Sequence, residues 1–250
     1  VLGRETWVHA KFRETQGLWD GRREEIVASY KRDVIDLTEA LGFDLITVGM
    51  NPSAHSSSHP MEKVDEVTYR DTAGNLYRIS ATTHDLMPYK IRTDNYTVPT
   101  VEQVQEQIDR LDREGLTKPD DSCWEVLRHV VATMKPTHWI NVCVGDLSFP
   151  SVGPTDEEQF MNLILHPELH AKLAELHAKH CIATLPWYAE EGVDSVMPCG
   201  DLGSSTGLLA SPKILEEHVA PWWQEYVRCG HELGLKMIKH CCGCIWEALP

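Results

Sequence analysis

Short apolar runs alternate with longer amphipathic segments along this chain. Four runs read as buried strands, because they are too short for helices and end at glycine or polar residues. These are Phe43–Gly49, His138–Gly145, Val193–Cys199 and Leu235–Ile238. Elsewhere apolar residues recur at three- and four-residue spacing or follow helix-start signals, which predicts helices. The helical segments are Arg22–Leu41, Val101–Leu111, Ser122–Met134, Asp156–Leu165, Pro167–Glu191 and Ser211–Leu233.

The order of these elements predicts a parallel sheet covered by helices. Strand, polar loop, helix, glycine and strand follow one another repeatedly, as in α/β folds. A hairpin at Thr68–Thr83, turning at Asp71–Asn75, is expected to decorate this core. In parallel α/β sheets the active site lies at the carboxyl ends of the strands. Polar or sulfur-bearing residues follow the strands there: Met50, Asn51, Asp146, Asp201, His240 and Cys242.

Composition narrows the classes of partner. The chain has 250 residues, 42% of them hydrophobic, which is enough for a substantial core. Its formal charge of −15 argues against nucleic acid or an anionic membrane as partner. No apolar run reaches the roughly 18 residues of a transmembrane helix, and no signal-peptide pattern is present. A phosphate-binding glycine loop is also missing, which argues against ATP and NAD.

The eight cysteines lack the spacing of a small disulfide scaffold. Several lie inside apolar strand-like runs, which indicates reduced thiols and a cytoplasmic location.

The strongest chemical signal is the segment Lys239–Cys244, which follows the last predicted strand. If strand geometry continues, His240 and Cys242 point to one side and Cys241 to the other. An imidazole and a thiolate side by side suit Zn²⁺, although a catalytic zinc site needs about three protein ligands. The competing interpretation is a buried strand end with inert thiols. We favour the metal, because so many basic and polarisable groups rarely gather on a plain core strand.

From Val193 onward the sequence resembles the uroporphyrinogen decarboxylase-like superfamily, and most closely its zinc-dependent corrinoid methyltransferases of the methylcobamide:coenzyme M type. The resemblance rests on a strand-end Asp201 with its Gly/Ser-rich loop to Gly207, on Pro221 before a long helix, and on the H-x-C-G motif from His240 to Gly243. Upstream segments, including Asp71–Tyr77 and Pro167–Glu168, fit the family loosely.

The resemblance implies an eight-stranded (β/α)8 TIM-type barrel, of which this chain holds about four to five core strands and an inserted hairpin. We therefore expect residues 1–250 to form one barrel domain, truncated at the C-terminal end and, in one interpretation, at the N-terminal end. In the family the third zinc ligand is a cysteine well downstream of the H-x-C pair. It is expected beyond Pro250.

The activity that the resemblance implies is methyl transfer between a corrinoid and a thiol or another small molecule. His240 and Cys242 would bind Zn²⁺, and a corrinoid protein carrying a methylcobalamin-type cofactor would be the partner. Asp201 would orient or deprotonate the substrate, while Asn51, Asp146 and Ser204 would bind it. A purely structural hydrogen bond in the Gly/Ser loop is an equal alternative for Asp201. The sequence does not identify the methyl donor, the acceptor or the oligomeric state.

Three other functions stay open. A tetrapyrrole decarboxylase of the same superfamily is disfavoured, because Met50–Asn51 stands where those enzymes have a carboxylate and they need no H-x-C pair. The cysteines from Cys241 to Cys244 could hold an iron–sulfur cluster or form a redox dithiol. A corrinoid- or tetrapyrrole-binding module that has lost catalysis is the non-enzymatic alternative.

Overall fold

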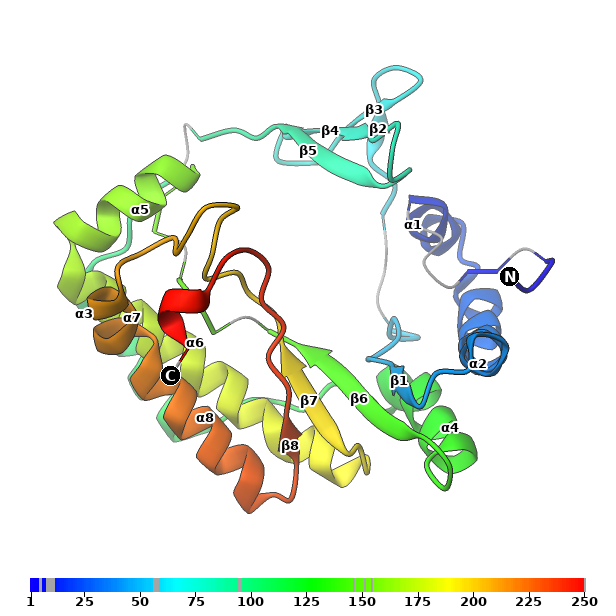
Figure 1. Cartoon of the computed structure of the whole chain (residues 1–250). Helices are drawn as coiled ribbons and strands as arrows, with labels where there is room; N and C mark the ends of the chain where they lie inside the picture. Colours follow the sequence, from blue (N-terminus) through cyan, green and yellow to red (C-terminus); the bar gives the residue numbers. More distant parts are fainter. Residues whose placement is uncertain are drawn as a thin grey trace. The chain divides into compact units, whose positions relative to one another are not determined.

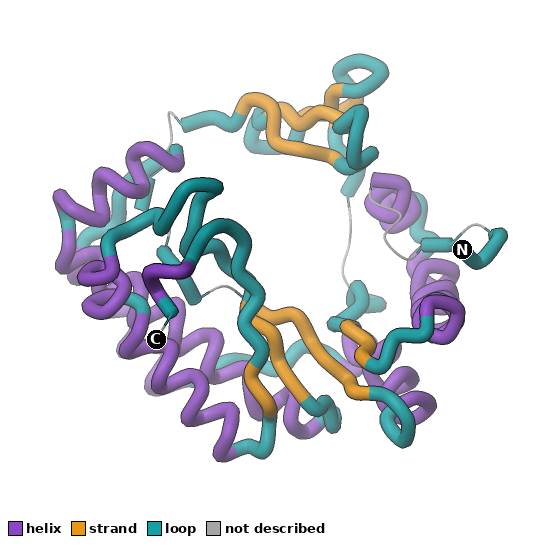
Figure 2. The backbone as a smooth tube through the Cα atoms, viewed as in Figure 1, coloured by secondary structure: helices purple, strands orange, loops and turns teal. Residues whose placement is uncertain are grey.

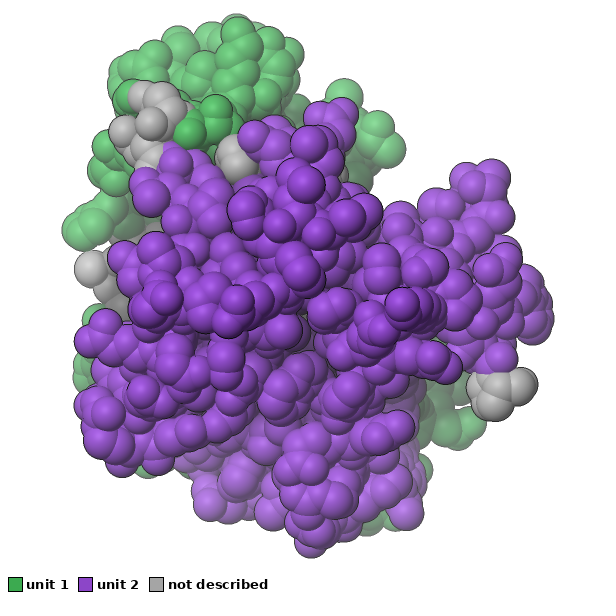
Figure 3. All heavy atoms as spheres, turned by 90° about the vertical axis from the view of Figure 1, so that its left-hand side faces the viewer, with its two compact units in different colours: residues 1–95, 119–138 green, residues 96–118, 139–250 purple. Residues whose placement is uncertain are grey.

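A computed structural model describes residues 1–4, 6–7, 12–55, 59–93, 96–145, 147–150, 152–153 and 155–249. The chain divides into two compact units, coloured separately in Figure 3. Unit 1 comprises residues 1–95 and 119–138, and unit 2 comprises residues 96–118 and 139–250. Each unit is therefore built from segments that are separated in the sequence, and the expected single barrel domain stays a prediction.

The helical part of unit 1 joins the start of the chain to its middle. It contains α1 (Phe12–Trp19), α2 (Arg23–Leu41), strand β1 (Leu45–Thr47), the short helix η1 (Asp121–Trp124) and α4 (Glu125–Met134). As predicted, α2 ends at Gly42, whose φ of 66° is left-handed and favours glycine. The Arg23 guanidinium lies 2.8 Å from a Glu125 carboxylate oxygen, tying α2 to α4. Trp124 and Leu127 are fully buried beside this link.

The predicted hairpin is confirmed, and it belongs to a larger antiparallel sheet. Strand β3 (Thr68–Arg70) pairs with β4 (Leu76–Ile79). Two further strands, β2 (Glu62–Lys63) and β5 (Leu86–Lys90), extend the sheet at its two edges. Neither of these two strands is predicted from the sequence pattern.

Unit 2 contains the parallel α/β layer that the sequence predicts. Strands β6 (Trp139–Val144), β7 (Ser195–Pro198) and β8 (Lys236–Met237) pair in parallel, in that order. Helices α6 (Pro167–Glu190) and α8 (Ala220–Glu232) lie along this sheet, as Figures 1 and 2 show. The remaining elements are α3 (Val101–Glu114), α5 (Asp156–Leu165), α7 (Pro212–His218) and η2 (Trp246–Ala248).

Local sequence signals explain where the helices of unit 2 begin. Thr100 and Gln103 form a reciprocal capping box at the start of α3. Pro167 occupies the first turn of α6, where its missing N–H costs nothing. The segment predicted as one helix from Ser211 to Leu233 is instead two helices, α7 and α8, which meet at Val219. Pro221 follows this junction and lacks the N–H that a continuous helix would use.

Helix α3 packs on α6 through buried aliphatic side chains, among them Val104, Ile108 and Leu176.

Among the described helices, none combines the length and apolar character needed to cross a bilayer. The structure is thus mixed α/β with a parallel sheet flanked by helices.

Candidate metal centre at the ends of strands β7 and β8

Three side chains with metal-ligating atoms converge in unit 2. Asp201 follows β7, and His240 and Cys242 follow β8. One ligand atom from each residue lies within 4.8 Å of the other two. The His240 Nε2 and Cys242 Sγ atoms are 3.4 Å apart. The sequence placed all three residues at the strand ends and paired His240 with Cys242, and the structure brings the Asp201 carboxylate into the same group.

Parallel pairing of β7 and β8 brings these residues to the same edge of the sheet. The two strands are parallel, with Ser195 in register with Lys236. The loops that follow them therefore begin at the same edge of the sheet. Beyond the regular strands, a further bridge joins Cys199 to His240, and the His240 N–H donates to the Pro198 carbonyl at 3.1 Å. The backbone of His240 is thereby fixed against the end of β7.

The loop after β7 and the segment after β8 are also joined directly. The Cys242 N–H donates to Asp201 Oδ1 at 2.8 Å. The Leu202 N–H donates to Cys241 Sγ at 3.2 Å, and the Cys244 N–H donates to the Ser204 carbonyl at 2.7 Å. These bonds fix where Asp201 stands relative to the H-x-C pair.

The charges of the site influence one another. The pKa of Asp201 is lowered, mainly because its carboxylate accepts a hydrogen bond from the backbone N–H of Cys242. The negative charge of Asp201 in turn is the main cause that raises the pKa of the Cys242 thiol. Without a cation, the site therefore holds an ionised carboxylate beside a protonated thiol. A divalent cation would reverse this preference, because it stabilises both anions.

The donor set fits zinc. Imidazole nitrogen, thiolate sulfur and carboxylate oxygen are the three ligand types that Zn²⁺ uses, and in a tetrahedral site they lie about 3.3–3.8 Å apart. The 3.4 Å between His240 Nε2 and Cys242 Sγ falls in that range. All three side chains are exposed, so a fourth position would be open to a substrate. Among the described residues, this is the only group of three or more such side chains that could share one ion.

The other residues predicted for the site lie in different settings. Ser204 belongs to the same loop as Asp201, and its Oγ donates to the Gly207 carbonyl at 3.1 Å. Asn51 lies in unit 1, is 4% exposed, and its Oδ1 accepts the Val126 N–H at 3.0 Å at the start of α4. Asp146 lies outside the described residues. Substrate binding by these three residues stays a prediction.

Sequence reasoning missed the part that Cys241 plays. The thiol accepts the Leu202 N–H and donates to the Cys242 carbonyl at 3.4 Å, so both of these contacts are with backbone groups. The expectation that Cys241 points away from the H-x-C pair gave no partner for it, because a hydrogen bond between distant loops leaves no trace in sequence spacing.

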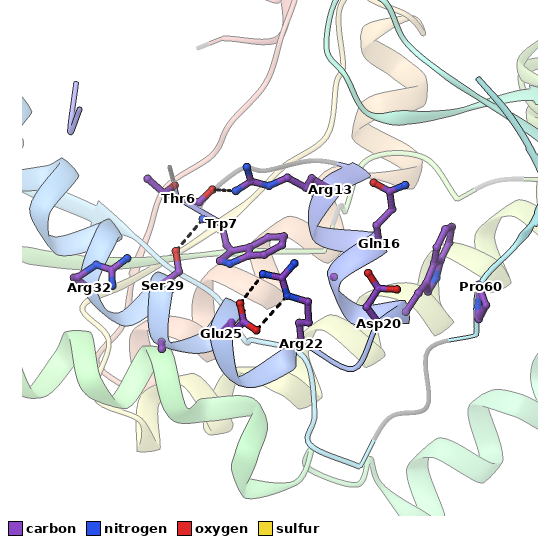
Figure 4. A pocket seen from close by; sticks show the side chains of 13 residues that line it. Thr6, Trp7, Arg13, Gln16, Asp20, Arg22, Glu25, Ser29, Arg32 and Pro60 are labelled. Atoms are coloured by element: carbon purple, nitrogen blue, oxygen red, sulfur yellow. Dashed lines mark hydrogen bonds and ion pairs between the residues drawn. The ribbon is translucent and has the colours of Figure 1, made fainter. Parts of the chain in front are cut away.

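A cavity of about 750 Å³ lies in unit 1, and none of the predicted site residues that the structure describes lines it. Figure 4 shows Trp7 at its centre with Arg13 and Arg22 close by. The guanidinium groups of Arg13 and Arg22 lie 4.6 and 5.1 Å from the centroid of the Trp7 ring. Arg22 is also ion-paired with Glu25 at 2.6 Å. Among the described residues that line this cavity, no three metal-ligating side chains come close enough to share an ion, so the candidate metal centre stays at the β7–β8 edge.

Comparison with known proteins gives a likeness in structure alone. No family model matches the sequence, and no curated protein matches it. A solved structure described as a methyltransferase from Methanosarcina mazei is similar, with a TM-score of 0.51 and 13% sequence identity. The match covers 87% of this chain and 57% of that chain. At this identity the match shows a similar fold, and the chain spans little more than half of the length of that protein.

Proposed function

We propose that this protein is a zinc-dependent methyltransferase that moves a methyl group between a corrinoid and a thiol or another small acceptor or donor. The observation that carries the proposal is the meeting of His240, Cys242 and Asp201 at the carboxyl edge of a parallel sheet. The similar fold of a methyltransferase from Methanosarcina mazei supports the same class of reaction. We also propose that β6, β7 and β8 belong to an eight-stranded α/β barrel.

His240 and Cys242 would hold the metal through Nε2 and Sγ, which already lie 3.4 Å apart. Zinc bound there would supply a Lewis acid that makes a thiol ionise at neutral pH. The remaining ligand would come either from Asp201 or from a cysteine farther along a longer chain, as the family resemblance implies.

Asp201 is suited to orient the substrate. Its pKa is lowered, so it stays an anion near neutral pH and accepts hydrogen bonds well, but it is a weak proton acceptor. Exposure of the site would let a corrinoid protein bring its cofactor to the metal. Ser204, in the loop that carries Asp201, would contact the small molecule.

The metal proposal is tested with purified protein and two single variants. We expect wild type to bind about one zinc ion, and His240→Ala and Cys242→Ala to bind it at least about 100-fold more weakly, since each removes a direct ligand. Methyl transfer with free methylcobalamin should fall with the metal. Zinc content by elemental analysis and the rate of methylcobalamin turnover are the two measurements.

Matched controls come from α8, where Cys229→Ala and His231→Ala remove the same kinds of side chain outside the candidate site. Both should keep zinc and turnover. Full zinc content and full turnover in the His240 and Cys242 variants would show that the site assignment is wrong.

A further inference from the structure

Four residues of the segment 239–244 are hydrogen-bonded to the loop 200–204. Lys239 Nζ donates to the Gly200 carbonyl at 2.6 Å, and Cys242 and Cys244 are bonded to Asp201 and Ser204. In the middle of this series, Cys241 Sγ accepts the Leu202 N–H. The side chain of Cys241, which lies between the candidate ligands His240 and Cys242 in the sequence, therefore connects the two segments.

The two backbones touch where a side chain would not fit. A Cβ atom added to Gly203 would lie 2.6 Å from the Cys244 carbonyl oxygen. A Cβ atom on Gly243, whose φ is 84°, would collide with the Gly203 carbonyl. Because backbone atoms cannot move aside as a flexible side chain can, this contact demands that the segments keep one fixed spacing.

The contacts of Cys241 differ from those of Cys242. Cys241 is half-buried, and its thiol both accepts a backbone N–H and donates to a backbone carbonyl. Cys242 is exposed, and its sulfur lies against the His240 ring. A thiol that contacts a backbone donor on the loop and a backbone acceptor on its own segment is suited to hold the two together.

We propose that Cys241 is a positioning residue, which latches the Asp201 loop to the segment that carries His240 and Cys242 and so sets the distance among the three ligand atoms. The inference rests on the proposed metal centre for its consequence, but the hydrogen bonds of Cys241 join residues of this chain alone. Cys241 does not bind the metal.

The first test is made without metal. In wild type the Leu202 amide should exchange with solvent more slowly than an unprotected amide, because its proton is donated to sulfur. Cys241→Ala should speed this exchange, since alanine has no acceptor, whereas Cys241→Ser should keep most of the protection. Amide exchange followed by NMR or by mass spectrometry of the 200–207 segment measures this.

The second test uses cobalt(II) as a spectroscopic substitute for zinc. Cys241→Ala should weaken cobalt binding about tenfold, the equivalent of losing one good hydrogen bond, with the thiolate-to-cobalt absorption unchanged once the site is saturated. Cys241→Ser should bind nearly as well as wild type. Cys242→Ala should lose the thiolate absorption. Thermal unfolding of each variant separates a local effect from general destabilisation.

Three outcomes overturn the latch: a Leu202 amide unprotected in wild type, unchanged cobalt affinity in Cys241→Ala, or loss of thiolate absorption in Cys241→Ser. The amide in wild type decides the matter even if Cys241→Ala does not fold. Failure of wild type to bind cobalt or zinc would contradict the proposed function instead, and would leave the exchange result standing on its own.

Discussion

A single buried imidazole shows how strongly the setting of one residue matters in this protein. His170 on α6 is 1% exposed, and neither ring nitrogen has a hydrogen-bond partner among the described residues. Its ring packs edge-on against His218, with centroids 5.3 Å apart, and near Phe149. Burial is the main cause that lowers the pKa of His170 to about 4, so the folded protein keeps this ring neutral.

This neutral ring predicts a loss of stability in mild acid. Well above pH 6.5 the imidazole is neutral in both the folded and the unfolded state, and the His170 contribution is complete. As the pH falls from 6.5 toward about 4, the unfolded chain takes up a proton that the folded protein rejects. The free energy of unfolding should fall by roughly 2 kcal/mol by pH 5. Urea unfolding at pH 7 and pH 5 measures the difference.

His170→Phe keeps an aromatic ring but cannot titrate, so it should remove that part of the pH dependence. His231→Gln, at an exposed position on α8, is the matched control and should retain it. An unchanged pH dependence in His170→Phe would mean that His170 is not the group responsible.

At the scale of elements, sequence patterns located most helices and the parallel strands. Helices α2, α3 and α6 carry end signals in their own residues, such as Gly42, Thr100 and Pro167, so local chemistry was enough to place them. Strand β2 has two exposed polar residues, and β5 contains Pro88, which a strand tolerates at an edge. Neither strand has an alternating apolar pattern in its sequence. Each is a strand because it pairs with its neighbour in the sheet.

The same distinction applies to the candidate metal centre. The closeness of His240 and Cys242 follows from their spacing, and the structure has the two ligand atoms within 3.4 Å. The approach of Asp201 depends on the pairing of β7 with β8 and on bonds between two loops. Tertiary contacts of this kind cannot be read from spacing along one segment.

The loop contact makes a prediction of its own. Gly203→Ala should reduce the free energy of unfolding by about 1–3 kcal/mol, because its Cβ atom would press on the Cys244 backbone. It should also weaken cobalt binding, since the loops must separate. Gly207→Ala is the control in the same loop, because nothing lies within 4 Å of the added atom. Urea unfolding curves and a cobalt titration of both variants check this, and equal behaviour of the two would contradict it.

At the scale of the molecule, each unit is assembled from segments that are distant in sequence. Unit 1 recruits residues 119–138, and Asn51 is one of the residues that hold them. The Asn51 side chain donates to the Ser122 carbonyl at 2.6 Å and accepts the Val126 N–H, while its own N–H donates to the Cys123 carbonyl. The residues of the candidate metal centre all belong to unit 2.

This division predicts that stability and metal binding can be separated. Asn51→Ala should lower the free energy of unfolding by about 1–3 kcal/mol, because it leaves buried backbone groups at the start of α4 without partners. Cobalt affinity should stay unchanged. Thermal or urea unfolding and a cobalt titration test both halves. A changed KM for the methyl donor or acceptor with unchanged stability would instead support the substrate-binding role that the sequence suggested.

The contact between Gly203 and Gly243 also limits which substitutions the two segments can accept. Two main chains in van der Waals contact accept neither bulk at those positions nor extra residues between them. Within this loop, substitutions that leave the contact intact are those at the exposed tip, around Ser205 and Thr206, where side chains face solvent. In homologous chains the base of the loop should therefore stay constant, while the residues at its tip can vary.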